Sequence, residues 1–422
     1  MNSQDARGAG MNSIEDRIAA ATRAAAQTVT PGSVPPLSLP AARARGGWRW
    51  RGLAPVMAAV VVAVIILAAV VGRDVLSTGK AAPGRPASSP SSVAALVRSG
   101  QIPAFYVLLT RSSQPGAGPV AAVVHATATG RALATVKPTS GRTVVAASMA
   151  ADDRTFVLDE EPWTAQGRAG QAPGALVLVR LTASGQAGSV TPLQVNVPDG
   201  ASLYGMALSP DGSRIALLTN HDGSASQVTV VTLAGGASRS WSGPGNIGVP
   251  YDRGALSWTA DQTRLAFTVE SGPAAGEVRV LDLNRASGSL LGDSTAVLSP
   301  GQQTTPDGTR VTWQGDAIIT PDGATVVTGA PSISLASGPG KSRDTTGFAE
   351  FSARTGKVTR VIVPSAAGLR HPGAVLWSDR TGRVLIVEAE FSDSLRVGVL
   401  IGNKFTPLNL TWPLQDGAYS TW

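Results

Sequence analysis

Residues 207–219 read "ALSPDGSRIALLT", in which two apolar runs flank the turn Pro210-Asp211-Gly212. In such a turn proline presets φ, the aspartate side chain accepts a hydrogen bond from the backbone two residues on, and glycine adopts a positive φ. The alternation of apolar residues on both sides predicts two antiparallel strands. Asp211 is either a turn residue or a carboxylate with a chemical function, and its recurrence elsewhere distinguishes the two.

The same pattern of apolar run, polar turn and second apolar run occurs four more times along the chain. The matching stretches are "ASMAADDRTFVLDE" from Ala147, "ALSWTADQTRLAFTVE" from Ala255, "DAIITPDGATVVTGA" from Asp316 and "AVLWSDRTGRVLIVEA" from Ala374. Their apolar anchors are Met149, Leu208, Trp258, Ile319 and Trp377, which are spaced by 59, 50, 61 and 58 residues. Self-similarity at a nearly fixed period predicts a repeat fold.

Hairpins are also expected between the turns. Each shows two alternating runs across a glycine-containing turn, and they cover residues 228–241, 278–291, 349–362 and 397–408. One repeat then holds two hairpins, or four strands. Because four-stranded sheets of about 40–60 residues arranged radially form a β-propeller, we expect an all-β propeller over residues 104–422.

The two ends of this region complement each other. Residues 105–111 and 122–136 supply three strands with no anchor strand before them, and residues 417–422 look like an anchor strand without its turn. Pairing the C-terminal strand with the first three closes the ring without a free sheet edge. Five internal units and this shared one predict six blades, with five or seven as alternatives. The extra turn signal at 304–313 is interpreted as an insertion before the fifth blade.

The turn aspartates are interpreted as structural. Asp211 and Asp322 occupy the same place in their repeats, and we assign Asp152, Asp261 and Arg380 to the equivalent place in the others. A catalytic carboxylate has no reason to recur in every blade or to be exchanged for arginine. The position therefore predicts a turn.

A membrane anchor is predicted before the propeller. Residues 53–72 contain no charge, and about 20 apolar residues suffice to cross the hydrocarbon core as a helix. The preceding segment is about 50 residues long, whereas a cleaved signal peptide has a short basic leader and a shorter apolar core. Arginines concentrate on the N-terminal side, in residues 43–51. We therefore expect a single-pass cell-membrane protein with a cytoplasmic N-terminus and an extracytoplasmic C-terminal domain.

Two further segments complete the expected organisation. Residues 1–51 form a cytoplasmic head with an Arg-rich flank and a short amphipathic helix at about 13–29, which begins with a capping-box pattern at Ser13. This helix is either a docking element for a cytoplasmic protein or a marginal helix. Residues 73–103 read as a Gly/Pro/Ser-rich linker. Translation could start at Met1 or at Met11, since "MNS" occurs at both.

Composition excludes several kinds of chemistry. The chain has no cysteine, and its three histidines, His125, His221 and His371, lie far apart in sequence. Thiolate sites are excluded, and a multi-histidine metal site is disfavoured. Residues 74–422 hold 27 basic and 25 acidic residues, so no basic stripe predicts nucleic-acid binding.

Candidate ligand motifs are weak. The glycine-rich stretches at 243–248 and 337–342 lack the helix that a dinucleotide or phosphate site requires, and both are interpreted as loops. Asp159, Glu160 and Glu161 could supply oxygen ligands to calcium, but the interpretation we favour places them in solvent at a blade edge. We therefore assign no catalytic, cofactor-binding or metal-ligating residue.

A resemblance covers most of the chain. The stretches "FYVLLTR", "ATATGRALATVKP", "AADDRTFVLDEEP" and "ALSPDGSRIALLT" resemble actinobacterial single-pass membrane proteins with an exported WD-repeat-like, TolB-type β-propeller. The head "SIEDRIAAATRAAA" is similar too. Members of that family largely lack an assigned function. The resemblance implies architecture and location, and it implies no activity.

The sequence favours a binding, sensing or interaction module over an enzyme. Propellers build sites from the loops of several blades, and nothing in the sequence marks a catalytic constellation. The expected partners are the membrane, an unidentified protein or small ligand at the propeller loops, and a cytoplasmic regulator at the head. The alternatives are a surface hydrolase or lyase that uses loop carboxylates, and a passive envelope scaffold.

Overall fold

The computed structural model describes the chain from residue 92 onward with short gaps. The described ranges are 92–110, 118–164, 167–168, 174–195, 201–221, 225–244, 256–272, 274–313, 317–338, 341–366, 368–392, 394–412 and 418–421. The chain divides into two units, Met1–Pro86 and Ala87–Trp422, and all described residues belong to the second. The predicted head helix at 13–29 and membrane span at 53–72 lie outside the described residues. Within the described ranges, no helix is long and apolar enough to span a bilayer.

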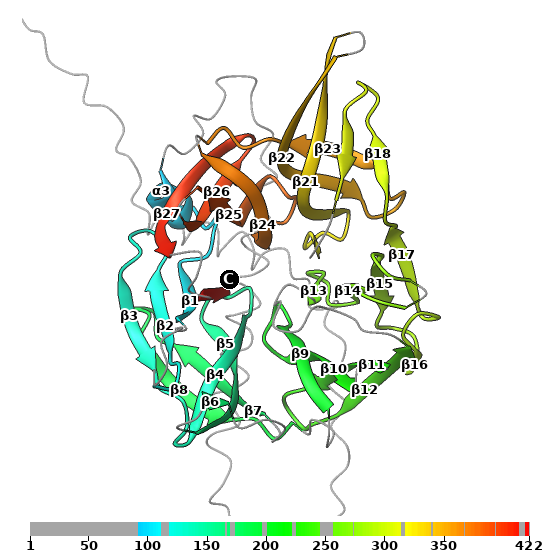
Figure 1. Cartoon of the computed structure of the whole chain (residues 1–422). Helices are drawn as coiled ribbons and strands as arrows, with labels where there is room; N and C mark the ends of the chain where they lie inside the picture. Colours follow the sequence, from blue (N-terminus) through cyan, green and yellow to red (C-terminus); the bar gives the residue numbers. More distant parts are fainter. Residues whose placement is uncertain are drawn as a thin grey trace, which may run out of the picture. The chain divides into compact units, whose positions relative to one another are not determined.

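Six antiparallel sheets stand around a central axis, which confirms the predicted six-bladed β-propeller (Figure 1). Blade 1 consists of β28 (Ala418–Thr421), β1 (Phe105–Thr110), β2 (Ala122–Ala126) and β3 (Ala132–Val136). Blade 2 consists of β4 (Arg142–Met149), β5 (Thr155–Thr164), β7 (Ala175–Leu181) and β8 (Ala187–Pro192), with β6 (Gly167–Arg168) beside β5. Blade 3 consists of β9 (Ala201–Leu208), β10 (Arg214–His221), β11 (Ala225–Thr232) and β12 (Ser238–Pro244).

The other three blades repeat this order. Blade 4 consists of β13 (Leu256–Trp258), β14 (Arg264–Thr268), β15 (Val278–Asp282) and β17 (Ser294–Leu298). Blade 5 consists of β20 (Ala317–Ile319), β21 (Thr325–Gly338), β22 (Lys341–Ser352) and β23 (Val358–Ile362), and blade 6 of β24 (Leu369–Ser378), β25 (Val384–Phe391), β26 (Leu395–Ile401) and β27 (Lys404–Trp412). The first strand of each blade is the innermost one.

Blade 1 joins the two ends of the propeller region. β28 pairs antiparallel with β1, from Val107 opposite Thr421 to Thr110 opposite Ala418. Figure 1 shows β28 near the axis, where the other blades have their first strands. The backbone ladder between these strands therefore closes the ring.

The extra turn signal at 304–313 belongs to blade 5. It joins β18 (Gln302–Thr304) to β19 (Arg310–Thr312), and β19 pairs with the distal half of β21 around Ile333. Figure 1 shows the long β21–β22 hairpin extending outward past the ring. The short β18–β19 hairpin therefore widens blade 5 and does not form a seventh blade.

The turns between first and second strands bond to one another around one face, here called the turn face. Ala151 N–H donates to Pro210 O at 3.0 Å, Ala260 N–H to Pro321 O at 2.7 Å, and Asp322 N–H to Arg380 O at 3.3 Å. The Arg214 guanidinium donates to Gln262 O at 2.8 Å, and Ala104 N–H donates to Asp153 Oδ2 at 2.6 Å. These bonds thus link blade 1 to blade 2 and each following blade to the next, as far as blade 6.

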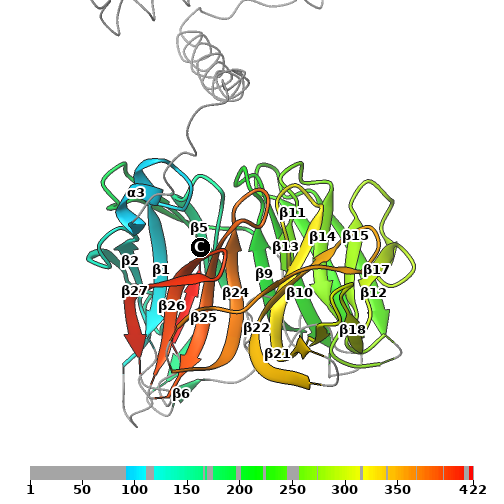
Figure 2. The same ribbon diagram turned by 90° about the horizontal axis from the view of Figure 1, so that it is seen from above.

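Blade 1 has no such turn, because its first strand comes from the C-terminus. A short helix, α3 (Val93–Arg98), lies in the segment expected as a linker and packs beside β1 instead (Figure 2). Its Leu96 is buried with Ile102 and Tyr106 against Ile386 and Val397 of blade 6. The helix thus contributes the apolar contact between blades 6 and 1.

The structure corrects the equivalent of the turn aspartate in blade 6. Arg380 supplies its carbonyl to blade 5, and the carboxylate role falls to Asp379. Its Oδ1 accepts from Thr381 N–H at 3.2 Å and from Arg383 N–H at 2.8 Å. The turn of blade 6 has the same length as the others, because Ser378 pairs with Leu385 as Leu208 pairs with Ile215. Thr381 therefore matches Asp211 in position, and the carboxylate comes from Asp379, two residues earlier.

Asp211 has the structural role that the sequence predicts. Its Oδ1 accepts from Ser209 Oγ at 2.7 Å and from Ser213 N–H at 2.9 Å. Partial burial raises the pKa of Asp211, but hydrogen bonds from Gln262, Ser213 and Ser209 outweigh it and lower the pKa to about 2. The carboxylate is therefore charged at neutral pH and holds the turn.

Asp211→Ala should lower the free energy of unfolding by about 1 kcal/mol at pH 7, because the turn loses its side-chain acceptor. Since the folded pKa is below the ordinary value, this contribution is present above pH 4 and should fade as the pH drops toward about 2. Urea titrations at pH 7 and pH 3 measure the difference. Asp211→Asn keeps a neutral acceptor and should cost less than the alanine variant, and an equal cost in both variants would contradict this account.

Candidate functional site

The three consecutive acidic residues of β5 are more buried than the sequence suggested. Asp159 and Glu160 are each 2% exposed, and Glu161 is half-buried, so the interpretation of a solvated blade edge is wrong. The reason is that β5 is the second strand of its blade and neighbouring elements cover both of its faces. Strand alternation places Asp159 and Glu161 on one face and Glu160 on the other.

Glu160 has a structural role on its face of the strand. Both of its carboxylate oxygens accept from Thr139 N–H, at 3.2 Å each, and Arg142 donates to its backbone carbonyl at 2.8 Å. Thr139 lies in the connection from β3 to β4. Glu160 therefore fixes the passage of the chain from blade 1 to blade 2.

Asp159 and Glu161 line a pocket between blades 2 and 3. The pocket holds about 420 Å³ of space, part of it open to solvent. Its wall comes from the two innermost strands β4 and β9 and from β5, and the lining residues are Val145, Ala146, Ala147, Asp159, Glu161, Leu203, Tyr204, Gly205 and Met206. Two carboxylates thus meet a mainly apolar wall beside the propeller axis.

Glycine at position 174 makes room for one of these carboxylates. A Cβ on Gly174 would lie 2.6 Å from Asp159 Oδ1, closer than side-chain atoms normally approach. Asp159 also lies opposite Leu176 in the β5–β7 ladder, so strands on both sides fix its backbone. The position of the Asp159 carboxylate is therefore set by the fold.

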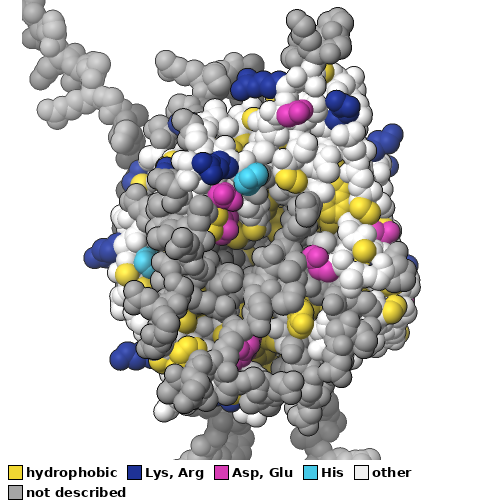
Figure 3. All heavy atoms as spheres, viewed as in Figure 1, with side chains coloured by type: hydrophobic (Ala, Val, Ile, Leu, Met, Phe, Trp, Pro, Cys, Tyr) yellow, Lys and Arg dark blue, Asp and Glu magenta, His cyan; other side chains and the backbone are white. Residues whose placement is uncertain are grey.

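The face shown in Figure 1 also has an uneven charge distribution. Among the side chains visible there, lysine and arginine lie mostly toward the rim, and several acidic side chains lie nearer the middle (Figure 3). The visible charges do not resemble a basic nucleic-acid surface.

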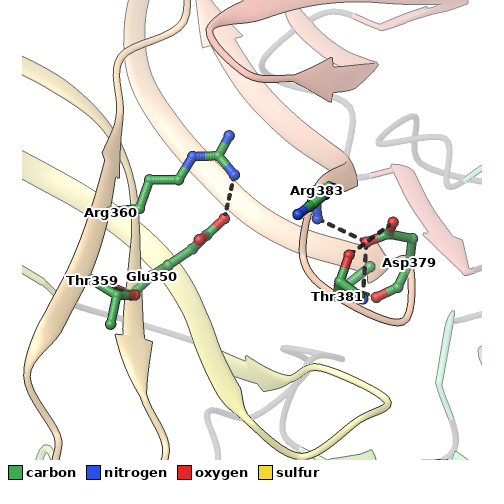
Figure 4. Close-up of polar contacts among 7 residues, drawn as sticks. Glu350, Thr359, Arg360, Asp379, Thr381 and Arg383 are labelled. Carbon is green, nitrogen blue, oxygen red and sulfur yellow. Dashed lines mark hydrogen bonds and ion pairs between the residues drawn. The ribbon is translucent and has the colours of Figure 1, made fainter. Parts of the chain in front are cut away.

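A second charged group lies between blades 5 and 6 (Figure 4). Glu350 on β22 is buried, and its Oε1 accepts from the Arg360 guanidinium at 3.0 Å. Burial raises the pKa of Glu350; Arg360 opposes this shift, and Asp379 adds to it. A Cβ on Gly382 would lie 3.6 Å from Glu350 Oε1, so the carboxylate faces the turn of blade 6. This pair joins β22 to β23 within blade 5 and lies beside the turn of blade 6.

Arg360→Met should lower the free energy of unfolding by about 1–2 kcal/mol at pH 7, because it leaves a buried carboxylate without its cation. The raised pKa of Glu350 means that folding favours its protonated form, so the penalty should shrink as the pH falls toward 4.5. Chemical denaturation at pH 7.5 and 4.5 tests this, with the double variant Glu350→Gln/Arg360→Met as the control. A penalty that does not change with pH would refute the charge explanation.

The three histidines that the sequence offered as metal ligands do not form a common site. The Nδ1 atom of His125 on β2 lies 2.9 Å from Gly130 O, and its ring stacks on Tyr106 with centroids 5.0 Å apart. His221 and His371 are in β10 and β24, so the three histidines belong to three blades. No group of three or more His, Asp or Glu side chains suited to a metal occurs among the described residues.

The two glycine-rich stretches, 243–248 and 337–342, each include the end of a strand. Residues 243–244 end β12, and the rest of the 243–248 stretch lies outside the described residues. Gly338 at the end of β21 pairs with Lys341 at the start of β22, and β22 continues to Ser352, so a strand and not a helix follows this stretch. A phosphate loop is excluded at 337–342.

Comparison with known proteins finds the fold and no family. No protein-family model matches the chain, and no curated protein matches it. Among solved structures, TolB from Acinetobacter baumannii matches with 12% identity and a TM-score of 0.46, over 75% of this chain and 66% of that one. A periplasmic gluconolactonase from Pseudomonas aeruginosa matches with 14% identity and a TM-score of 0.35, over 74% and 84%. An oligogalacturonate lyase in complex with manganese has 17% identity and a TM-score of 0.38, over 74% of each chain. These distant neighbours share the propeller and differ in activity.

Proposed function

We propose that this chain is a membrane-anchored, extracytoplasmic β-propeller that acts as a binding or sensing module, with the pocket between blades 2 and 3 as its binding site. The observation that carries the proposal is the pocket itself, a partly open hollow beside the axis with two carboxylates in a mainly apolar wall. Concave, mainly apolar sites with a few placed polar groups are typical of ligand binding.

The sequence supports the anchor and its orientation. The uncharged stretch at 53–72 has the length of a membrane span, and the arginines at 43–51 favour a cytoplasmic N-terminus. The head at 1–51 would then reach a cytoplasmic regulator while the pocket samples the outside. This arrangement suits a sensor better than a free enzyme.

Site-specific photo-crosslinking in intact cells tests the binding role. A photoreactive amino acid replaces Leu203, which lines the pocket, or Val190, which is 51% exposed on the outer strand β8. We expect a discrete adduct from position 203 that position 190 does not give and that Ala146→Phe, which fills the pocket, abolishes. The same adducts from both positions, or none from position 203, would refute the proposal.

The carboxylates also allow the second candidate, a surface hydrolase or lyase, to be tested. Two carboxyl groups in one pocket are the groups that glycoside hydrolysis uses. Turnover of a polysaccharide or peptide panel by the full chain, abolished by Glu161→Gln, would favour that candidate over a binding module. Binding without turnover favours the sensor.

A further inference from the structure

The chain enters the propeller at the turn face. Helix α3 ends at Arg98, and Ala104, just before β1, donates its N–H to Asp153 Oδ2 in the first turn of blade 2 at 2.6 Å. Figure 2 shows α3 at one end of the ring, above β1. Residues 73–92 separate α3 from the predicted span at 53–72, and these twenty residues reach about 70 Å at most when extended. The predicted anchor therefore attaches to the propeller on the side of the turn face.

The turns between third and fourth strands lie on the turn face as well. Antiparallel pairing brings the end of each third strand back beside the start of the second. Leu233 N–H donates to Ser213 O at 2.9 Å in blade 3, and Ala353 N–H donates to Ala324 O at 2.9 Å in blade 5. The turn face thus consists of two rows of turns, an inner row between first and second strands and an outer row between third and fourth strands.

Every blade contributes an exposed basic side chain to this face. In order from blade 1 to blade 6, these residues include Arg131, Arg154, Arg239, Arg285, Lys357 and Lys404. The Nε atoms of Arg154 and Arg285 each lie 3.9 Å from a carboxylate oxygen of a nearby aspartate. The side chains of Arg131, Lys357 and Lys404 take part in no ion pair with another described residue. The exposed basic groups are therefore spread around the whole ring and are not confined to one blade.

The aspartates of the inner turns are held within those turns. Oδ1 of Asp261 accepts from Thr263 N–H at 3.1 Å, and Oδ1 of Asp322 accepts from Ala324 N–H at 2.9 Å, as in the turn of Asp211. Their carboxylates thus lie close to the backbone, whereas lysine and arginine side chains are longer and carry their charge farther from it. A surface with this arrangement presents positive charge to a partner.

We propose that the turn face docks on an anionic lipid surface, with its ring of arginine and lysine side chains against the headgroup phosphates. The inference rests on the membrane anchor of the proposed function. Phosphates accept charge-assisted hydrogen bonds from both kinds of side chain, and an anionic bilayer attracts basic residues within about one Debye length of its surface. The membrane is favoured over an acidic protein or polysaccharide because the chain leads from the predicted span directly to this face.

Docking in this orientation has a consequence for the pocket between blades 2 and 3. Leu203 lies near the start of β9 and Glu161 near the end of β5, and both of these strand ends are remote from the turn face. Lipid would cover the turns, and the pocket would stay accessible to a ligand from outside. The two faces of the propeller would then have different tasks, attachment and binding.

Fluorescence quenching in reconstituted vesicles tests the inference on the full-length chain. The chain has no cysteine, so a single introduced cysteine can be labelled alone. Ala286→Cys places a fluorophore in the outer turn of blade 4, where residue 286 is exposed. Ser342→Cys is the matched control, because Ser342 is also exposed and lies about 30 Å along β22 from its turn-face end at Ser352.

The quencher is a lipid with a nitroxide on its headgroup, which acts only at short range. In phosphatidylcholine vesicles with about 30% phosphatidylglycerol, we expect quenching at position 286 to exceed that at position 342 at least threefold. The ratio should fall below about 1.5 in vesicles of phosphatidylcholine alone. It should fall similarly in the anionic vesicles at about 0.5 M KCl, because salt screens the attraction.

Two triple variants separate the turn face from the net charge of the chain. Arg354→Gln/Lys357→Gln/Lys404→Gln removes three exposed basic groups from the turn face and should bring the quenching ratio below about 1.5. Lys137→Gln/Arg343→Gln/Arg370→Gln removes three exposed basic groups from the opposite ends of the strands and should leave the ratio unchanged. Both variants should keep the parental melting temperature within about 2 °C, since the substitutions are on the surface.

The anchor and the docking fail in different ways. Alkaline carbonate extraction of the neutral vesicles tests the anchor, because a membrane span resists it and a peripheral contact does not. Release of the chain would overturn the anchor and with it this inference. Retention with equal quenching at the two positions, or with quenching that does not depend on lipid charge, would overturn the docking and leave the anchor standing. An equal effect of both triple variants would do the same.

Discussion

Truncation of the chain before Ala418 is expected to lower the free energy of unfolding by about 3–5 kcal/mol and to make the protein self-associate. The truncation removes β28, whose four residues pair with β1. Each backbone hydrogen bond makes a net contribution of about 0.5–1.5 kcal/mol to stability. Loss of β28 also removes the innermost strand of blade 1. The newly exposed edge of β1 can then pair with another chain.

Chemical denaturation with size-exclusion chromatography measures both effects. Ser420→Ala is the control, because it keeps the main-chain ladder with Leu108 and should change stability by less than about 0.5 kcal/mol. A truncated chain with unchanged stability and a monomeric elution volume would show that the ring does not depend on β28.

Repetition made the propeller predictable from the sequence. A single Pro-Asp-Gly turn occurs in many folds, but five related turns with anchors such as Leu208 and Trp258 imply five equivalent inner strands. The structure places these anchors in β4, β9, β13, β20 and β24, and it bonds the turns to one another around the turn face. The role of Asp211 in the turn therefore follows from the sequence alone.

The candidate site could not be predicted in the same way. Strand alternation indicates that Asp159 and Glu161 share a face of β5, but it does not say what lies opposite. Burial of that face depends on β9 of the next blade, about 45 residues farther along the chain. A signal was present in the sequence: three acidic residues inside an otherwise apolar strand conflict with a solvated edge, which usually alternates.

The sequence pattern also did not predict two short elements that lie outside the repeat. Helix α3 has six residues, too few for a helical period to be recognised, although Ser92 before it is a favourable N-cap residue. The two-residue strand β16 (Gly288–Ser289) lies within a stretch expected as a hairpin and pairs parallel with β12 of blade 3. Both elements acquire their structure from the neighbour on which they pack.

Trp241 shows how much such a neighbour contributes. It lies on β12, the fourth strand of blade 3, which would normally face solvent on one side, yet its side chain is 0% exposed. The loop that carries β16 covers it: Trp241 Nε1–H donates to Ala286 O at 3.1 Å, and Leu290 packs in the same cluster. The Arg239 guanidinium lies over the Trp241 ring, 5.2 Å from its centroid.

Trp241→Ala should lower the free energy of unfolding by about 3–5 kcal/mol, because it leaves a cavity between blades 3 and 4 and an unpaired Ala286 carbonyl. Trp241→Phe retains most of the apolar contact and should cost less, about 1–2 kcal/mol. Urea unfolding followed by circular dichroism measures both variants. The cost should appear without a change in fold, since the backbone ladder of β12 with β11 is unaffected.

The matched control is Val190→Ala on β8, the fourth strand of blade 2. Val190 is 51% exposed and no second strand pairs with β8 on its outer side in the described structure, so its truncation should change stability by less than about 0.5 kcal/mol. Similar costs for the two outer-strand variants would show that the loop around β16 does not seal blade 3. A large cost for Trp241 alone would make that loop the element that ties blade 4 to the outer edge of blade 3, in addition to the contacts at the turn face.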